Sequence, residues 1–352
     1  MAADDPVLLR TEGRAGYLTL NRPRALNALT HPMVRTLDAA LAGWEADPAV
    51  EVVVVTGAGE RGLCAGGDIR AVRADVLEGG TASLGFWRDE YRLNARIARY
   101  PKPYVAVMDG YVMGGGVGVS AHGDVRVVTE RSAVAMPETG IGFVPDVGGT
   151  YLLARAPGEL GTHLALTGTA VGAADALLCG LADHFVPSGR LRELTASLAS
   201  VEVTEAVGRY AEEAPGGELA LHRGWIDACY CADSVEEIVD RLLAHGDPAA
   251  NEAAETILTR SPTSLKVTLA AVRRAGELGA LEPALNQEYR VSCAAFRSPD
   301  LVEGVRAQVV DKDRRPRWSP AELSQVTKAD VERFFAPLGE RELGLGGDLV
   351  GG

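Results

Sequence analysis

The sequence has few cysteines, few aromatic residues and a shortage of basic charge, and it contains no long apolar run. Its five cysteines are not spaced as paired Cys-x-x-Cys motifs, which favours reduced thiols over a disulfide framework or a zinc site. The 35 basic residues against 48 acidic ones give a formal net charge of −13. A balance that acidic argues against nucleic acid or an anionic membrane as a partner. No apolar run approaches the ~18 residues of a membrane-spanning helix. We therefore expect no metal, no nucleic acid and no membrane partner.

The remaining composition is typical of a folded chain. Hydrophobic residues make up 47% and charged residues 24% of 352 positions, which is enough to bury a substantial core. The first ten residues, MAADDPVLLR, lack the basic start and apolar stretch of a secretion signal. They also lack the arginine-rich pattern of a transit peptide. This pattern predicts a cytoplasmic protein.

Hydrophobic periodicity predicts an α/β core followed by a helical region. We expect strands within 6–21 and over 51–56, 104–108 and 125–129, with helices over 32–44, from about Asp68, and over 83–99. Beyond about residue 190 the apolar spacing becomes helical. In 234–245, for example, Ser234 and Glu237 form a candidate capping box. The segment 212–218 is a candidate hinge. The predicted division is a core over 1–200, a helical region over 201–337 and a loose, glycine-rich tail over 338–352.

Glycine is abundant, with 41 residues, and three clusters bear on function. The run GAGERG (57–62) matches a dinucleotide-binding pattern, but no second strand follows it, so a surface loop is the favoured interpretation. The other two clusters, over 64–68 and 114–118, each connect a predicted strand to a helix. Two such turns side by side can aim two backbone N–H groups at one carbonyl oxygen, as in an oxyanion hole. Tight helix–sheet packing is the structural alternative.

Four segments carry a resemblance to a known family. The runs over 21–29, 63–69, 108–120 and 136–150 resemble, in order, the crotonase or enoyl-CoA hydratase/isomerase superfamily. The resemblance implies a repeated β-β-α core with a helical C-terminal part, often assembled as trimers, and hence a possible homo-oligomer. It also implies an acyl-CoA substrate, so that CoA enters as part of the substrate and no separate cofactor is expected.

The resemblance assigns the binding residues as well. It implies that the thioester carbonyl is held by the N–H groups of Cys64 and Gly115, within substrate-binding turns that include Gly66, Gly67 and Gly114. Arg24 matches an early basic position of the family and is a candidate contact for the CoA phosphates or adenine.

The carboxylates decide which reaction is expected. The hydratases resembled here use two glutamates, but this chain has Gly118 at one of those positions; the other matches Glu138, and Asp146 follows eight residues later. Thioester hydrolysis needs less acid help, because the leaving thiolate has a pKa of ~8.5. The segments 263–269, 285–290 and 303–318 resemble members of the superfamily that hydrolyse 3-hydroxyisobutyryl-CoA in valine breakdown. In those members a further substrate-contacting glutamate matches Glu90.

Several interpretations stay open from sequence alone. Glu138 either attacks the thioester to form an anhydride or acts as general base to a water, and Asp146 orients that water or binds the substrate hydroxyl, for which Glu90 is a second candidate. Taken singly, Glu138 would be a surface or helix-start acid, Asp146 a helix cap and Glu90 part of a solvated helix face. The alternative functions are an enoyl-CoA hydratase or double-bond isomerase, and an acyl-CoA binder without catalysis.

Overall fold

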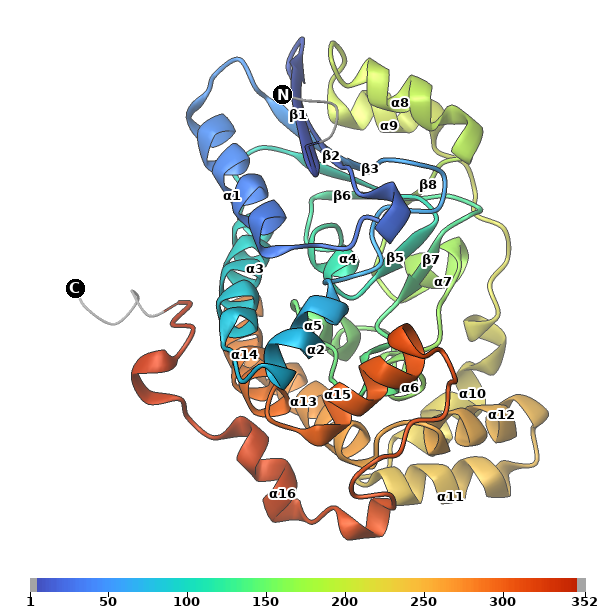
Figure 1. Ribbon diagram of the computed structural model, residues 1–352. Coiled ribbons are helices and arrows are strands. Elements are labelled where there is room, and N and C mark those ends of the chain that lie inside the picture. Colours follow the sequence, from blue (N-terminus) through green and yellow to red (C-terminus); the bar gives the residue numbers. More distant parts are fainter. Residues whose placement is uncertain (1–4, 347–352) are drawn as a thin grey trace. The chain divides into compact units, whose positions relative to one another are not determined.

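The computed structural model describes residues 5–346 (Figure 1). The chain divides into two compact units built from alternating segments. Unit 1 comprises the described residues up to 67 together with 92–135 and 170–217. Unit 2 comprises 68–91, 136–169 and 218–346. The last boundary falls inside the predicted hinge over 212–218. The predicted domain division was sequential, whereas these units interleave, and that division stays a prediction.

Unit 1 is organised around a six-stranded sheet in the order β1-β2-β3-β4-β6-β8 (Figure 1). The strands are β1 (Val7–Glu12), β2 (Ala15–Leu20), β3 (Val52–Gly57), β4 (Tyr104–Met108), β6 (Val125–Val128) and β8 (His184–Phe185). Only the β1–β2 pair is antiparallel; β2, β3, β4, β6 and β8 run parallel. A separate parallel pair joins β5 (Tyr111–Met113) to β7 (Ala133–Ala135).

The helices of unit 1 are α1 (His31–Ala46), α4 (Gly115–Gly118), α7 (Ala173–Leu178), α8 (Leu191–Ser197) and α9 (Val203–Tyr210), with short 3-10 turns η1 (Pro23–Ala25) and η3 (Ser188–Arg190). Val52 and Val54 of β3 pack in one cluster with Leu194 of α8 and Val207 of α9. Val53 and Val55, which point the other way, are also fully buried. Burial on both faces explains why this strand reads as a continuous apolar run.

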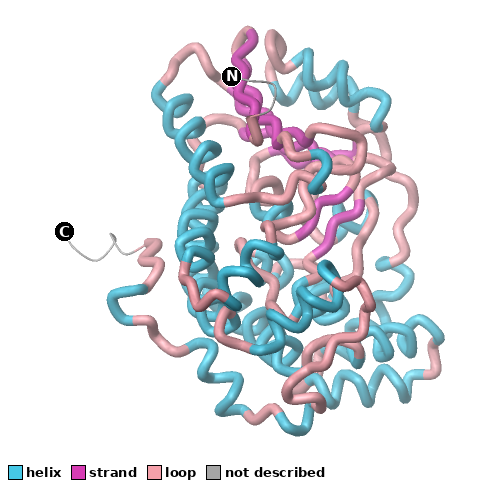
Figure 2. The backbone as a smooth tube through the Cα atoms, viewed as in Figure 1, coloured by secondary structure: helices cyan, strands magenta, loops and turns pink. Residues whose placement is uncertain are grey.

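Unit 2 contains helices and loops but no strand within its described residues (Figure 2). Its helices are α2 (Ile69–Leu77), α5 (Gly149–Ala154), α6 (Leu160–Thr167), α10 (Leu219–Tyr230), α11 (Val235–His245), α12 (Pro248–Leu258), α13 (Pro262–Leu278), α14 (Leu281–Ala295), α15 (Pro299–Val305) and α16 (Lys328–Glu332). The first ten residues of α3 (Ala82–Ala98) belong to unit 2 and the rest to unit 1. The short 3-10 turns are η2 (Glu138–Ile141), η5 (Leu323–Gln325), η6 (Arg333–Phe335) and η7 (Gly339–Arg341), and η4 (Arg306–Val310) is a short π-helix.

The main elements predicted from periodicity are confirmed, with ends that shift by one or two residues. Helix α2 begins where predicted, and Asp68 caps it, since the Asp68 carboxylate accepts a hydrogen bond from the Ala71 N–H at 3.4 Å. Ser234 likewise accepts from the Glu237 N–H at 3.2 Å, so one bond of the predicted capping box is made. Of the predicted loose tail over 338–352, residues 347–352 lie outside the described residues. Within the described part, Leu345 exchanges two hydrogen bonds with Asn286.

Candidate active site

The two glycine turns predicted to bind a carbonyl oxygen lie side by side in unit 1. The Cys64 N–H donates to the Tyr111 oxygen at 3.1 Å, and the Cys64 oxygen accepts from the Met113 N–H at 2.9 Å. These two bonds form a short parallel bridge, which ties the turn after β3 to the turn that begins α4.

Glycine is required at two positions because the backbones of the two turns approach each other too closely for a side chain to fit between them. A Cβ added to Gly116 would lie 2.3 Å from the Cys64 oxygen, and one added to Gly66 would lie 3.2 Å from the Met113 oxygen. Gly66 also has φ +102°, which side-chain-bearing residues rarely adopt. The close approach therefore depends on the absence of side chains at these positions.

Accounting for the backbone donors corrects one prediction. Because the Cys64 N–H is already bonded to Tyr111, Cys64 is not an oxyanion donor, contrary to expectation. The Ala65 N–H donates to the Leu26 oxygen at 3.0 Å, and the Gly66 N–H points to the Cys64 sulfur at 3.4 Å. The Gly67 N–H and the Gly115 N–H donate to no acceptor in the described part of the chain. The candidate donor pair is therefore Gly67 and Gly115. The sequence could not reveal this, because the competing acceptor comes from a distant segment.

The close contact between the turns yields a first prediction, for Gly116→Ala. The added methyl would force the turns apart, so we expect the turnover rate to fall about 10-fold to 100-fold and the stability by about 1–3 kcal/mol. Gly43→Ala is the matched control. Its Cβ would meet nothing within 4 Å on α1, so activity should be unchanged and stability slightly higher. Activity and thermal unfolding of both variants test this, and wild-type turnover by Gly116→Ala would contradict it.

The three predicted carboxylates lie in unit 2, and all three are buried. Glu90 on α3, Glu138 at the start of η2 and Asp146 in the loop before α5 are 2%, 6% and 5% exposed. This burial contradicts the simple interpretations of Glu138 as a surface acid and Glu90 as part of a solvated face. Asp146 is not the helix cap either, because Gly148 occupies that position in α5. The side chains are thus held inside the protein, where an ionised carboxylate is costly unless it is paired, hydrogen-bonded or neutralised by a proton.

The hydrogen-bond partner of Asp146, Tyr91, and the residue bonded to that partner, Ser292, were not identified from sequence. The Tyr91 hydroxyl donates to Asp146 Oδ2 at 2.6 Å and lies 2.7 Å from the Ser292 Oγ. Tyr91 follows Glu90 on α3, and Ser292 lies on α14. In the sequence, a tyrosine at this helical position looks like an ordinary core residue. Its hydrogen bond to Asp146 is therefore visible only in the structure.

The acids form one electrostatic cluster with Glu288 of α14. Burial raises the pKa of Glu138 well above its usual value, and the charges of Asp146, Glu288 and Glu90 add to that effect. Burial, and then the charge of Asp146, raises the pKa of Glu90 in the same way. The pKa of Asp146 rises to about 7 through burial, although the Tyr91 hydrogen bond opposes the shift. Burial also raises the pKa of Glu288 to about 8. Such a cluster holds protons near neutral pH, as acid–base chemistry requires.

Two of these carboxylate oxygens have no hydrogen-bond partner among the described residues. They are Glu138 Oε2 and Glu90 Oε1, both fully buried. Buried polar atoms in native structures are nearly always bonded. These two oxygens are therefore the atoms of the cluster whose hydrogen-bonding capacity the described residues leave unused.

The raised pKa of Asp146 predicts how stability depends on pH. The folded state keeps this proton up to about pH 7, whereas the unfolded chain releases it near pH 4. The folded state binds more protons between these values, so this group lowers stability as pH rises through that range. The Asp146→Asn variant lacks this titrating group and therefore lacks this loss of stability with rising pH. We expect its melting temperature, relative to wild type, to be higher at pH 8 than at pH 5. A difference that does not change with pH would contradict the assignment.

Three further predictions concern Arg24, metal-binding residues and membrane-spanning helices. Arg24 is exposed, and its backbone oxygen accepts from the Arg61 guanidinium at 3.1 Å, so its contact with CoA stays a prediction. A search of the described residues finds no cluster of three or more metal-binding side chains. No helix in the described ranges is long and apolar enough to cross a membrane.

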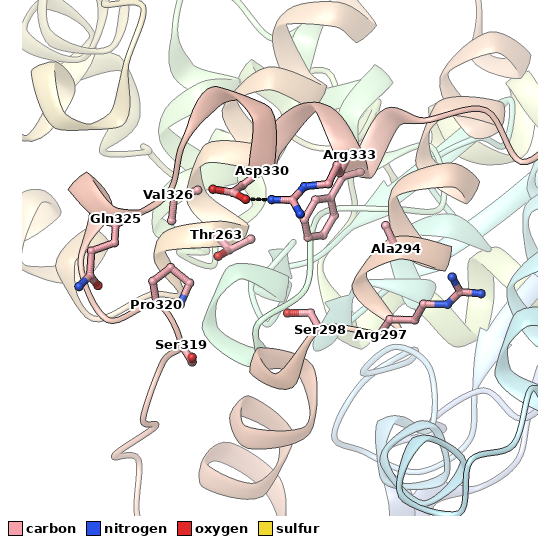
Figure 3. A pocket seen from close by; sticks show the side chains of 11 residues that line it. Thr263, Ala294, Arg297, Ser298, Ser319, Pro320, Gln325, Val326, Asp330 and Arg333 are labelled. Atoms are coloured by element: carbon pink, nitrogen blue, oxygen red, sulfur yellow. Dashed lines mark ion pairs between the residues drawn. The ribbon is translucent and has the colours of Figure 1, made fainter.

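Unit 2 also contains a separate cavity (Figure 3). It is lined by residues of α13, α14, the connection between α14 and α15, and the segment after α15: Thr263, Ala294, Arg297, Ser298, Ser319, Pro320, Gln325, Val326, Asp330, Arg333 and Phe334. Its one acid, Asp330, forms an ion pair with Arg333. The cavity therefore offers no unpaired carboxylate for thioester chemistry.

Comparison with known proteins places this geometry in context. The enoyl-CoA hydratase/isomerase family model matches residues 15–335. The mitochondrial 3-hydroxyisobutyryl-CoA hydrolase of Gallus gallus is 43% identical, over 98% of this chain and 91% of the relative. The mitochondrial 3-hydroxyisobutyryl-CoA hydrolase of Homo sapiens is 41% identical, over 97% and 91%.

Two solved structures share the fold over nearly the whole chain. A carnitinyl-CoA dehydratase from Mycobacterium thermoresistibile is 56% identical with a TM-score of 0.94, covering 97% of this chain and 98% of that one. An enoyl-CoA hydratase from Rhodobacter sphaeroides 2.4.1 is 44% identical with a TM-score of 0.91, covering 96% and 99%. The predicted crotonase-like α/β fold with a helical C-terminal part is confirmed. The chain belongs to the enoyl-CoA hydratase/isomerase family.

Proposed function

We propose that the protein hydrolyses an acyl-CoA thioester, converting 3-hydroxyisobutyryl-CoA and water into 3-hydroxyisobutyrate and CoA, a step of valine breakdown. The observation that carries the proposal is the buried Glu138, whose Oε2 has no hydrogen-bond partner among the described residues. The curated relatives named 3-hydroxyisobutyryl-CoA hydrolase, at 41–43% identity over nearly the whole chain, support the choice of substrate.

In this proposal the backbone stabilises the charge that forms on the thioester oxygen. The Gly67 and Gly115 N–H groups bind that oxygen as the carbonyl carbon becomes tetrahedral. When the carbon–sulfur bond breaks, the electron pair leaves with sulfur as a thiolate, which needs little help from an acid because its pKa is ~8.5. A backbone donor pair and one activated oxygen nucleophile are therefore a sufficient catalytic set.

Two routes for Glu138 satisfy this chemistry. As nucleophile, its carboxylate oxygen attacks the carbonyl carbon, CoA leaves as thiolate, and water then cleaves the resulting anhydride and restores Glu138. As general base, it takes a proton from a water that attacks the same carbon directly. In both routes Asp146, held by the Tyr91 hydroxyl, orients the water or binds the substrate hydroxyl. Glu90, with its unbonded Oε1, is the second candidate for that hydroxyl.

Hydration or dehydration is the alternative, and the names of the two solved structures favour it. The hydratases that this chain resembles have a glutamate at the position of Gly118. Here that residue is a buried glycine within α4. Without the second acid at that place, addition of water across a double bond lacks one of its two proton carriers, so hydrolysis is the better supported reaction.

The remaining parts of the proposal concern binding and location. We propose that Arg24 contacts the phosphates or adenine of CoA, that CoA enters only as part of the substrate, and that the chain forms a homo-oligomer. We also propose a reducing compartment, the cytoplasm, because none of the five cysteines forms a disulfide. The curated relatives cited above are named mitochondrial, so localisation of a tagged full-length chain is the test.

The test of the proposed reaction is a thiol assay with 3-hydroxyisobutyryl-CoA. We expect release of free thiol in proportion to enzyme concentration, and little loss of the enoyl absorbance when crotonyl-CoA is supplied instead. Loss of that absorbance without thiol release would identify a hydratase. Binding of either thioester without turnover would identify a non-catalytic acyl-CoA binder.

A further inference from the structure

The loop that carries Asp146 adopts a backbone conformation unfavourable for its own sequence. Val147, the next residue, has φ +53°, and Gly148 has φ +80°. The left-handed region suits glycine but is a true outlier for a β-branched residue such as valine. Val147 is also only 1% exposed, so its side chain is fixed in the interior. Such a conformation persists only where the surroundings impose it.

The side chain of Glu288 on α14 is what holds this loop. Its Oε2 accepts from the Gly148 N–H at 2.6 Å, and its Oε1 accepts from the Thr150 N–H at 2.9 Å and the Thr150 hydroxyl at 2.5 Å. Three donors thus converge on one carboxylate that is 1% exposed. Both carboxylate oxygens of Glu288 accept hydrogen bonds, and together these bonds clamp both sides of the Gly148–Gly149 step.

The same helix also contacts Tyr91, the residue whose hydroxyl donates a hydrogen bond to Asp146. Ser292 lies one helical turn beyond Glu288 on α14, and its Oγ is 2.7 Å from the Tyr91 hydroxyl that donates to Asp146. Side chains one turn apart therefore support the backbone that follows Asp146 and the hydroxyl that binds its carboxylate.

We propose that Glu288 is a positioning residue, which clamps the strained Val147–Gly148 turn and so fixes Asp146 for the reaction. It contacts no reacting atom in this scheme. It acts through the loop, and the inference rests on the proposed hydrolase function.

The decisive variant is Glu288→Gln. A glutamine has one acceptor oxygen, and its amide group would face an N–H donor of the loop, so at least one of the clamping bonds is lost. We expect kcat for thiol release to fall about 10-fold to 30-fold with KM changed less than about twofold, because a small misplacement of a catalytic group affects the transition state most. Hydrogen exchange at Gly148 and Thr150 should become faster, which is a readout independent of activity.

A rescue variant separates positioning from a merely structural role. Val147→Gly removes the need to hold valine in the left-handed region, because glycine adopts it freely. The double variant should have a kcat at least threefold higher than Glu288→Gln alone, measured at a temperature where every variant is folded. Gln287→Met is the matched control, since Gln287 is the neighbouring buried residue of α14 and bonds to the Ala271 oxygen instead; its kcat should match wild type.

The outcomes distinguish this inference from the proposed function. If wild type releases thiol but Glu288→Gln keeps its kcat and its exchange protection, the positioning role is wrong. It is also wrong if kcat falls and Val147→Gly gives no recovery, because the loss would then not pass through the strained turn. If wild type releases no thiol, the proposed function fails, while the exchange measurement still tests the clamp.

Discussion

Replacement of Glu138 by glutamine should lower kcat for CoA release by about 10³-fold to 10⁴-fold. The amide keeps the shape of the side chain but can neither attack the thioester nor accept a proton from water. Because the carboxyl is buried and Oε2 has no partner among the described residues, its removal should disturb few contacts. Thiol release under saturating 3-hydroxyisobutyryl-CoA measures the effect, and KM should change little.

Glu255→Gln provides the matched control for this variant. It makes the same chemical change on α12 of unit 2, at an exposed position outside the acid cluster, and should retain wild-type kcat. If Glu138→Gln kept more than about a tenth of wild-type activity, neither the nucleophile nor the general-base role could stand.

The second large effect is expected for Asp146→Asn, with kcat lower by about 10²-fold to 10³-fold. Asparagine still offers an oxygen to the Tyr91 hydroxyl, so the side chain should stay in place while its charge is lost. The loss therefore reports on the orientation of water or of the substrate hydroxyl and not on collapse of the loop. Steady-state kinetics with 3-hydroxyisobutyryl-CoA measures it.

Two comparisons make the Asp146 result interpretable. Asp240→Asn on α11, at an exposed position, should leave kcat unchanged. The Asp146→Asn protein should also be at least as stable as wild type at pH 8, since it removes a buried acid whose pKa is raised. A variant with full activity would exclude Asp146 from the reaction, and one that is both inactive and unfolded would point to a purely structural residue.

Local sequence signals were sufficient for most of the fold. The valine run of β3, the apolar stripe of α1 and the cap at Asp68 each depend on nearby residues, so periodicity and capping rules located them. The interleaving of the two units depends on contacts between distant segments. No local pattern reports such contacts, so the interleaving could not be predicted from the sequence.

The details of the site also depend on contacts between residues that are distant in the sequence. Glycine patterns and family resemblance pointed to the turns after β3 and β5, but the choice between Cys64 and Gly67 depends on the bond from Cys64 to Tyr111. Burial of Glu90 was equally hidden, because α3 carries many charges in sequence. Glu288 had no visible signal, since its role lies in a backbone conformation at Val147 that only coordinates show.

One competition experiment tests the central claim most directly. Wild-type protein is incubated with equal amounts of 3-hydroxyisobutyryl-CoA and crotonyl-CoA, and the acyl products are followed by mass spectrometry. The account predicts that 3-hydroxyisobutyrate and free CoA accumulate while crotonyl-CoA persists. Hydrated crotonyl-CoA, or the unsaturated acyl-CoA formed by loss of water from 3-hydroxyisobutyryl-CoA, accumulating without free CoA would contradict it.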